Sequence, residues 1–176
     1  MGFQNRRPLT IVLGAVFVGG TLTILLLVQI QPWSSSSTTS QVSNAFTAHL
    51  QKIASRNVSA VMMDYENNAT VVFEGNTAGV SCNCTSFPRI RYLFQSAFTG
   101  LLNLSVTEIS PTYRLTGIKG VVNSTLMLLG YSKTIGRFNG TISAEAVYDR
   151  AGVGWLISSE TWNFRVFNCN PWSCKA

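Results

Sequence analysis

Residues 138–148 read FNGTISAEAVY, and their side chains alternate between two classes. Phe138, Ile142 and Tyr148 share one side of an extended strand with small residues, whereas the other side carries polar groups such as Glu145. Alternation over this length is typical of a strand with one buried side. The stretch therefore predicts a sheet that covers an apolar core on one face and meets water on the other.

Three more strands are expected around this one. The segment 149–154, DRAGVG, predicts a hairpin turn, and residues 155–166 return as the last strand. Upstream, in residues 105–115 and 121–134, helical periodicity stops and glycine and asparagine separate strand-like runs. The C-terminal part of the domain is thus predicted to hold four consecutive antiparallel strands.

Three amphipathic helices precede these strands. Apolar residues at three- and four-residue spacing form a stripe in residues 42–53, and a second stripe, Val58 to Tyr65, follows the expected N-cap Asn57. A short strand over residues 70–74 comes next. The third helix starts after Ser86, and its apolar face comprises Ile90, Leu93, Phe94, Ala97, Phe98 and Leu101. This order predicts an α+β fold in which three helices pack on a curved antiparallel sheet.

The longest apolar segment is residues 9–30, LTIVLGAVFVGGTLTILLLVQI, which carry no charge. A helix of this length spans the hydrocarbon core of a bilayer, which is about 30 Å thick. Arg6 and Arg7 precede it and the next basic residue is Lys52, so the positive-inside rule places residues 1–8 in the cytoplasm. We expect a single-pass transmembrane helix in the cell membrane, with the rest of the chain outside.

Two export signals compete with this interpretation. A cleaved signal peptide, which would leave the protein secreted, has the same basic start, but its apolar core is usually about 7–15 residues long. Residues 29–33, QIQPW, also lack a small-x-small cleavage site. A twin-arginine signal is the second competitor. Residues 31–41, QPWSSSSTTSQ, predict a Ser/Thr-rich stalk that leads to an extracytoplasmic domain over residues 42–176.

Six N-x-S/T sequons agree with an extracytoplasmic domain, because each has a residue other than proline in the middle. Asn57 has a competing role as a helix cap. In a host that glycosylates its surface proteins, the sequence predicts sugar at Asn57, Asn68, Asn83, Asn103, Asn123 and Asn139.

The four cysteines form two groups, Cys82 with Cys84 and Cys169 with Cys174. A bridge between Cys82 and Cys84 would be strained in an extended strand, so two disulfides that join this loop to the C-terminal tail are expected. The alternative is a bridge within the tail that leaves the first group for a metal. Four thiolates at these spacings would also suit zinc or copper(I), but an oxidising compartment favours disulfides, so no metal is expected.

Two stretches carry a resemblance to a known family. Residues 49–61, HLQKIASRNVSAV, continue into residues 64–71, DYENNATV, and the chain later reads YDR at 148–150, GWLI at 154–157 and ETW at 160–162. The segment 42–167 resembles SnoaL-like proteins of the nuclear transport factor 2-like (NTF2-like) superfamily. The resemblance implies a cone with an apolar pocket. Some relatives are isomerases or polyketide cyclases with a buried aspartate or histidine base, and others bind ligands or pair through the open sheet face.

Two side chains are candidates for acid–base chemistry in such a pocket. His49, the only histidine, lies on the stripe of the first helix, and Glu160 shares the side of its strand with Trp162. The competing interpretations are a histidine that covers the core edge and a glutamate at the surface. Asp64 and Glu66 are expected to be solvated.

Aromatic residues are numerous enough to line a pocket, and equally to fill a core: Tyr65, Tyr92, Tyr113, Tyr131, Trp155 and Trp162. The sequence contains no nucleophile elbow, zinc-protease, phosphate-loop or dinucleotide motif, so neither a cofactor nor catalytic machinery is evident. Beyond Arg6 and Arg7, eleven basic and seven acidic residues are scattered without a basic run, which argues against nucleic-acid binding.

The sequence therefore predicts a membrane-anchored, extracytoplasmic NTF2-like domain that acts as a binding or assembly module at the cell surface. A small apolar ligand in the pocket and a homodimer through the sheet face are the expected partners besides the bilayer. An isomerase- or cyclase-type enzyme with a pocket acid or base is the first alternative. A surface protein that binds metal through its cysteines is the second.

Overall fold

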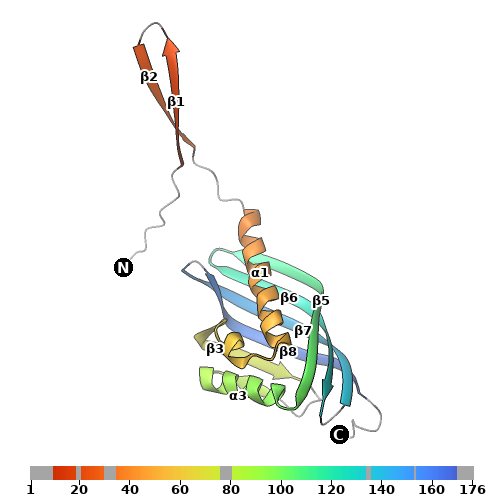
Figure 1. Cartoon of the computed structure of the whole chain (residues 1–176). Coiled ribbons are helices and arrows are strands. Elements are labelled where there is room, and N and C mark those ends of the chain that lie inside the picture. The colour runs from red at the N-terminus through yellow and green to blue at the C-terminus, as the bar shows by residue number, and fades with distance from the viewer. Residues whose placement is uncertain are drawn as a thin grey trace. The chain divides into compact units, whose positions relative to one another are not determined.

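The structure, a computed structural model, describes residues 10–18, 21–29, 35–75, 81–133, 136–152 and 154–169. Side chains are described within residues 39–164 of this set. The chain divides into two compact units, Met1–Ser35 and Ser36–Ala176. The second unit holds all of the helices and the larger sheet of the described chain (Figure 1).

The first unit contains a hairpin in place of the predicted transmembrane helix over residues 9–30. Strands β1 (Thr10–Val18) and β2 (Thr21–Gln29) pair antiparallel, with Val18 opposite Thr21. Both strands are rich in β-branched residues, and two glycines stand between them in the sequence, which is a strong hairpin signal. Among the described helices, none is long and apolar enough to cross a membrane.

The second unit opens with helices α1 (Ser35–Ala54) and α2 (Val58–Met62), close to the predicted positions. The α1 stripe is buried, as expected. Asn57 caps α2, because its Oδ1 accepts a hydrogen bond of 3.0 Å from the Ala60 N–H. Between the helices, Arg56 has a left-handed φ of 57°, and its N–H donates to the Ile53 carbonyl at 2.9 Å. This left-handed cap ends α1 and turns the chain toward α2.

Strand β3 (Tyr65–Glu74) begins earlier than the sequence predicts. Tyr65 was expected to continue the second helical stripe, but α2 ends at Met62 and Tyr65 is already paired with Ile157. The spacing of apolar residues in this segment fits both structures, because apolar residues at positions 58, 61, 62 and 65 do not exclude a strand that starts at the last of them. Strand β4 (Cys82–Cys84) and helix α3 (Phe87–Phe98) follow.

Four long strands complete the sheet: β5 (Leu101–Thr116), β6 (Lys119–Ser132), β7 (Gly136–Ala151) and β8 (Gly154–Cys169). The sheet order is β4-β3-β8-β7-β6-β5, and all neighbours are antiparallel except β3 and β8. The alternation predicted for residues 138–148 is confirmed in β7, where every second residue from Phe138 to Tyr148 is buried. The predicted α+β class and the run of four antiparallel strands are therefore correct.

Helix α1 lies across one face of the curved sheet, and α3 lies beside β3 and β4 (Figure 1). The contact with α1 is close at Gly120 of β6, where a Cβ atom would lie 2.6 Å from Val42 Cγ2. The core between helices and sheet contains the buried side chains Phe46, Met62, Ile90, Phe94, Leu126, Ile142, Tyr148 and Ile157. The inner face of the sheet is therefore the side on which α1 packs, over β6 and β8.

The cysteine pairing differs from the prediction. Cys82 and Cys84 form a disulfide with each other, and their Cα atoms are 5.4 Å apart, within the range that a disulfide requires. Cys82 is level with Trp162, because both pair with Phe73. The backbone of Cys169 lies seven residues further along β8, about 20 Å away at the rise of a strand, which is too far for a bridge to the β4 loop. Cys174 and the side chain of Cys169 lie outside the described residues.

This disulfide also removes two of the thiolates that the predicted metal alternative requires. The asparagines of the six sequons all lie at exposed positions, on the α2 cap and on strands β3 to β7. Their side chains are accessible to modifying enzymes, and sugar attachment stays a prediction.

Candidate active site

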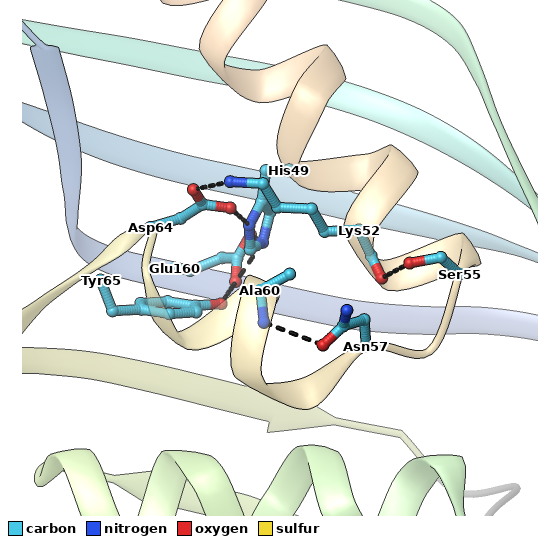
Figure 2. Close-up of polar contacts among 8 residues, drawn as sticks. All are labelled: His49, Lys52, Ser55, Asn57, Ala60, Asp64, Tyr65 and Glu160. Atoms are coloured by element: carbon cyan, nitrogen blue, oxygen red, sulfur yellow. Dashed lines mark hydrogen bonds and ion pairs between the residues drawn. The ribbon is translucent and has the colours of Figure 1, made fainter.

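A buried polar cluster lies where α1 meets β3 and β8 (Figure 2). His49 comes from α1, Asp64 from the turn between α2 and β3, Tyr65 from the start of β3, and Glu160 from β8. The amphipathic period of α1 turns His49 inward, and the alternation of β8 turns Glu160 toward the same core. Both side chains are at most 1% exposed. The structure thus brings together the two acid–base candidates found in the sequence.

His49 bridges two carboxylates with its two ring nitrogens. Nδ1 lies 2.9 Å from Asp64 Oδ2, in a hydrogen bond, and Nε2 lies 3.3 Å from Glu160 Oε1, in an ion-pair contact without hydrogen-bond alignment. The second partner of Asp64 is Lys52, one turn after His49 on α1. Asp64 was predicted to be solvated, which is wrong. The prediction assumed that the helix continues to Tyr65, whereas the chain turns at Met63 and directs the carboxylate back to α1.

Tyr65 links the other side of the cluster. Its hydroxyl group donates a hydrogen bond to Glu160 Oε2 and lies 3.4 Å from His49 Nε2. The Tyr65 and His49 rings meet edge to face, with centroids 5.4 Å apart. The ring of Phe94 of α3 also packs against Tyr65, with centroids 6.0 Å apart. The phenol is therefore fixed in orientation by aromatic packing as well as by its hydrogen bond.

The cluster determines the charge of His49. Burial alone would lower the pKa of the imidazole, but the Glu160 charge and the hydrogen bond with Asp64 raise it to about 9. Burial opposes ionisation of Asp64 as well, yet His49 and Lys52 together lower the pKa of this carboxyl group. His49 is thus an imidazolium at neutral pH, and the two cations of the cluster balance two carboxylates.

A protonated His49 with both nitrogens facing carboxylates cannot accept a proton. It can donate one, as Tyr65 can, and burial together with the Glu160 charge raises the pKa of Tyr65 well above its usual value. The remaining base of the buried cluster is the Glu160 carboxylate. Lys52, with a 34% exposed side chain, and Asp64 connect His49 to solvent. The chain of contacts therefore runs from the surface to a carboxylate in the core.

One oxygen of this carboxylate and two buried polar atoms of nearby strand residues have no hydrogen-bond partner within the described part of the chain. They are Glu160 Oε1, the Tyr148 hydroxyl oxygen and Trp162 Nε1. All three side chains point from β7 and β8 to the inner face of the sheet. A buried polar group without a partner costs about 1–3 kcal/mol. Such atoms are commonly completed by water or by a polar group of a ligand.

The other aromatic residues predicted for a pocket are not gathered around this cluster. Trp162 stacks on Phe73 with ring centroids 5.6 Å apart, and Tyr113 donates its hydroxyl to Glu108. Tyr92 is 71% exposed, Tyr131 lies on the outer face of the sheet, and Trp155 packs at the edge of the core. Of the six predicted residues, Tyr65 contacts Glu160 directly and Trp162 is its strand neighbour.

Sequence reasoning missed three residues of the site. Asp64 and Lys52 were not associated with His49, although Lys52 follows it by three residues and so lies on the same side of the helix. Tyr148 was assigned to the buried face of its strand, but its unpartnered hydroxyl gives no signal in the sequence. Glu145, by contrast, is exposed on the outer face, as predicted.

Comparison with known proteins gives matches in structure alone. No protein-family model and no curated protein matches the chain. A scytalone dehydratase candidate from Novosphingobium aromaticivorans superposes with a TM-score of 0.67 at 5% identity, covering 77% of this chain and 89% of that one. A dehydratase candidate of the NTF2-like family from Streptomyces avermitilis gives a TM-score of 0.67 at 12% identity, with coverages of 76% and 99%.

The domain has the NTF2-like fold.

A third similar structure is a hexachlorocyclohexane dehydrochlorinase, LinA-type3, from Novosphingobium barchaimii, with a TM-score of 0.66 at 10% identity and coverages of 77% and 92%. Identities this low show the fold and leave activity open. The NTF2-like architecture expected from the sequence resemblance is confirmed for the domain that follows the N-terminal hairpin. The buried cluster lies inside the NTF2-like cone, between its helices and its sheet.

Proposed function

We propose that this NTF2-like domain is an acid–base enzyme that removes a proton from carbon in an elimination or isomerisation. The observation that carries the proposal is Glu160, a fully buried carboxylate with the proton donors Tyr65 and His49 at its oxygens and unpartnered polar atoms beside it. A buried base with adjacent donors is the arrangement that this chemistry needs.

The roles follow from the contacts. Glu160 Oε1 is the proton acceptor. The Tyr65 hydroxyl and the His49 imidazolium are the donors that would polarise a carbonyl group or protonate a leaving oxygen. Asp64 holds His49 in orientation through Nδ1, and Lys52 holds Asp64. Among the similar structures are a dehydratase candidate and a dehydrochlorinase, two kinds of enzyme that catalyse eliminations, and this supports the same reaction class here.

The substrate class follows from the surroundings of Glu160. The core around it is apolar and aromatic, and the free polar atoms are two donors, Tyr148 and Trp162, and one carboxylate oxygen. A small, mostly apolar molecule with a carbonyl or hydroxyl group next to an acidic C–H bond would fit this environment. No cofactor is required, because donor and acceptor are both side chains.

The test is proton exchange at carbon. Full-length protein is incubated in deuterated buffer with a panel of cyclic and aryl ketones and β-hydroxy ketones, and exchange or water loss is followed by NMR. Glu160→Gln is expected to reduce the rate at least about 100-fold, the usual contribution of a positioned base. The matched control is Glu145→Gln, on the outer face of the same sheet, with an unchanged rate.

Two results would contradict the proposal. The first is a folded wild-type protein that exchanges none of the panel faster than buffer. The second is a Glu160→Gln variant as active as wild type. Tyr65→Phe removes the proposed donor, and Tyr92→Phe, at a 71% exposed position, is its control. The melting temperature of every variant is recorded, so that a loss of the donor can be distinguished from a loss of stability.

We also propose that residues 9–30 attach the protein to a membrane, with the NTF2-like domain outside the cytoplasm. The support is in the sequence: 22 residues without charge, two arginines before them and six sequons after them. Full-length protein translated with microsomes should remain in the pellet after alkaline carbonate washing and lose mass on endoglycosidase treatment. Release by carbonate without any sugar would contradict both parts.

A further inference from the structure

A cavity of about 590 Å³ lies on the outer face of the sheet, at one end of β5, β6 and β7. Its walls are two rows of side chains on neighbouring strands. In the first row Asn103 pairs with Tyr131, which pairs with Arg137. In the second, Ser105 pairs with Leu129, which pairs with Asn139. The volume is within the range of small-molecule sites, which is roughly 300–1,000 Å³.

The cavity is separate from the candidate active site. Arg137 lies nine residues before Ala146 on β7, and Ala146 is the partner of Glu160. At the rise of a strand this is about 30 Å. Arg137 also points to the outer face, whereas Glu160 points to the core. A ligand in the cavity would therefore not touch the acid–base cluster.

Arg137 gives the cavity an unbalanced positive charge. Its side chain is exposed, and no ion pair or hydrogen bond to it is found within the described part of the chain. None of the residues that line the cavity is acidic. In the full sequence, residues 109–144 and 161–176 contain neither Asp nor Glu, and the carboxylate of β5, Glu108, pairs with Leu126, five residues along β6 from the partner of Arg137, Tyr131. A guanidinium group in this situation is suited to a carboxylate, which it binds in a bidentate manner.

The other side chains that line the cavity indicate the chemistry of the uncharged part of the ligand. Tyr131 is 45% exposed beside Arg137, and Leu129, 42% exposed, is two residues away on the same strand, so together they form an apolar surface next to the charge. Gly130 between them lets the Phe138 ring pack against the backbone, because a side chain there would overlap that ring. Asn103, Ser105 and Asn139 line the rest and supply donors and acceptors for hydroxyl groups.

The geometry points to a second binding site in this cavity, for a small organic carboxylate with a ring and hydroxyl groups. The carboxylate binds Arg137, the ring lies on Tyr131 and Leu129, and the hydroxyl groups meet Asn103, Ser105 and Asn139. The ligand spans three strands without reaching the core.

The test uses 4-hydroxybenzoate as the probe and 4-hydroxybenzamide as its uncharged match. Sugar on Asn103 or Asn139, which are both in sequons, would fill the cavity, so the inferred site requires these two sequons to be unmodified. Full-length protein in a nonionic detergent is therefore made in a host that adds no N-linked sugar. Binding is measured by isothermal titration calorimetry. We expect the carboxylate to bind at least tenfold more tightly than the amide. Arg137→Gln should abolish that difference, and Arg114→Gln, an exposed arginine elsewhere on β5, should preserve it.

Three results would overturn the inference. One is equal affinity of the acid and the amide for the wild-type protein. Another is unchanged affinity in Arg137→Gln, with the melting temperature showing that the variant is folded. The third is loss of binding in Glu160→Gln but not in Arg137→Gln, which would place the probe at the candidate active site. Retained binding in Glu160→Gln supports an independent site, whatever the outcome of the proton-exchange test.

Discussion

His49 Nε2 lies 3.3 Å from Glu160 Oε1, so a helix from the start of the domain and the last strand of the sheet meet through a buried charge pair. The same imidazole is hydrogen-bonded to Asp64 through its other nitrogen. Removing one member of a buried pair leaves the other without compensation, which usually costs about 3–5 kcal/mol. The stability of the fold and the protonation of its candidate active site are therefore linked.

Stability should fall as the pH rises above neutrality. His49 has a pKa of about 9 in the folded protein and about 6.5 when unfolded, so protonation favours the folded state. The stabilisation is complete below pH 6.5 and is lost as the pH passes 9. The difference between the two pKa values corresponds to about 3 kcal/mol in the free energy of unfolding, at 1.36 kcal/mol per pKa unit. Urea unfolding between pH 6 and pH 10 measures it. In His49→Gln this slope should disappear, and an equal slope in both proteins would refute the assignment.

Asp64→Asn should lower the pKa of His49. The carboxylate favours the charged imidazole, and its removal should move the midpoint down by about one to two pH units. Because His49 is the only histidine in the chain, its ring proton signals can be followed by NMR titration without assignment. Asp149→Asn is the matched control, since Asp149 faces Lys119 at 3.6 Å and does not contact the cluster. An unchanged midpoint in Asp64→Asn would disprove the contact.

Gly120→Ala should destabilise the domain by about 1–3 kcal/mol, the usual cost of overpacking. The added Cβ atom would lie 2.6 Å from Val42 Cγ2 and push α1 away from β6. Gly154→Ala is the control, because its nearest neighbour is 3.9 Å away. Chemical unfolding compares the two variants. Val42→Ala should recover part of the loss in Gly120→Ala, and additive effects would show that the residues do not touch.

The disulfide can be located by peptide mapping. Tryptic digestion after Arg56 and Arg89 releases residues 57–89, which contain both Cys82 and Cys84. Without reductant this peptide should appear by itself, two hydrogen atoms lighter than its reduced form. A cross-linked species that joins it to residues 166–175 would instead restore the pairing expected from the sequence.

Side-chain periodicity was sufficient to predict the α+β class, the element order from α1 onward except for strand β4, which was expected to be a loop, and the inward faces of α1, α3 and β7. It failed at Tyr65, where a helical stripe and the start of a strand bury the same positions. It also failed for Cys82, because the local approach of the Cα atoms to 5.4 Å is not encoded in spacing. At the N-terminus, a charge-free segment indicated a helix, whereas β-branched composition around two glycines gives a hairpin.

The site was predicted only in part for a related reason. His49 and Glu160 could be recognised from their positions on apolar faces, one by one. Their meeting with Asp64 depends on where α2 stops and on the register between β3 and β8, which are set by tertiary packing. Membrane attachment, sugar on the sequons and pairing of two copies through the sheet involve groups outside this chain, and they stay predictions.

The parallel pairing of β3 with β8 also affects biosynthesis. Strand β3 emerges from the ribosome before most of the sheet, but apart from the three residues of β4 its partner is β8, the last strand of the described domain. Until residues 154–169 have left the exit tunnel, β8 covers neither the edge of β3 nor the apolar side of α1 that faces the sheet. Folding of the domain is therefore delayed until β8 has been synthesised, and the apolar edge and faces that β8 covers stay exposed until then.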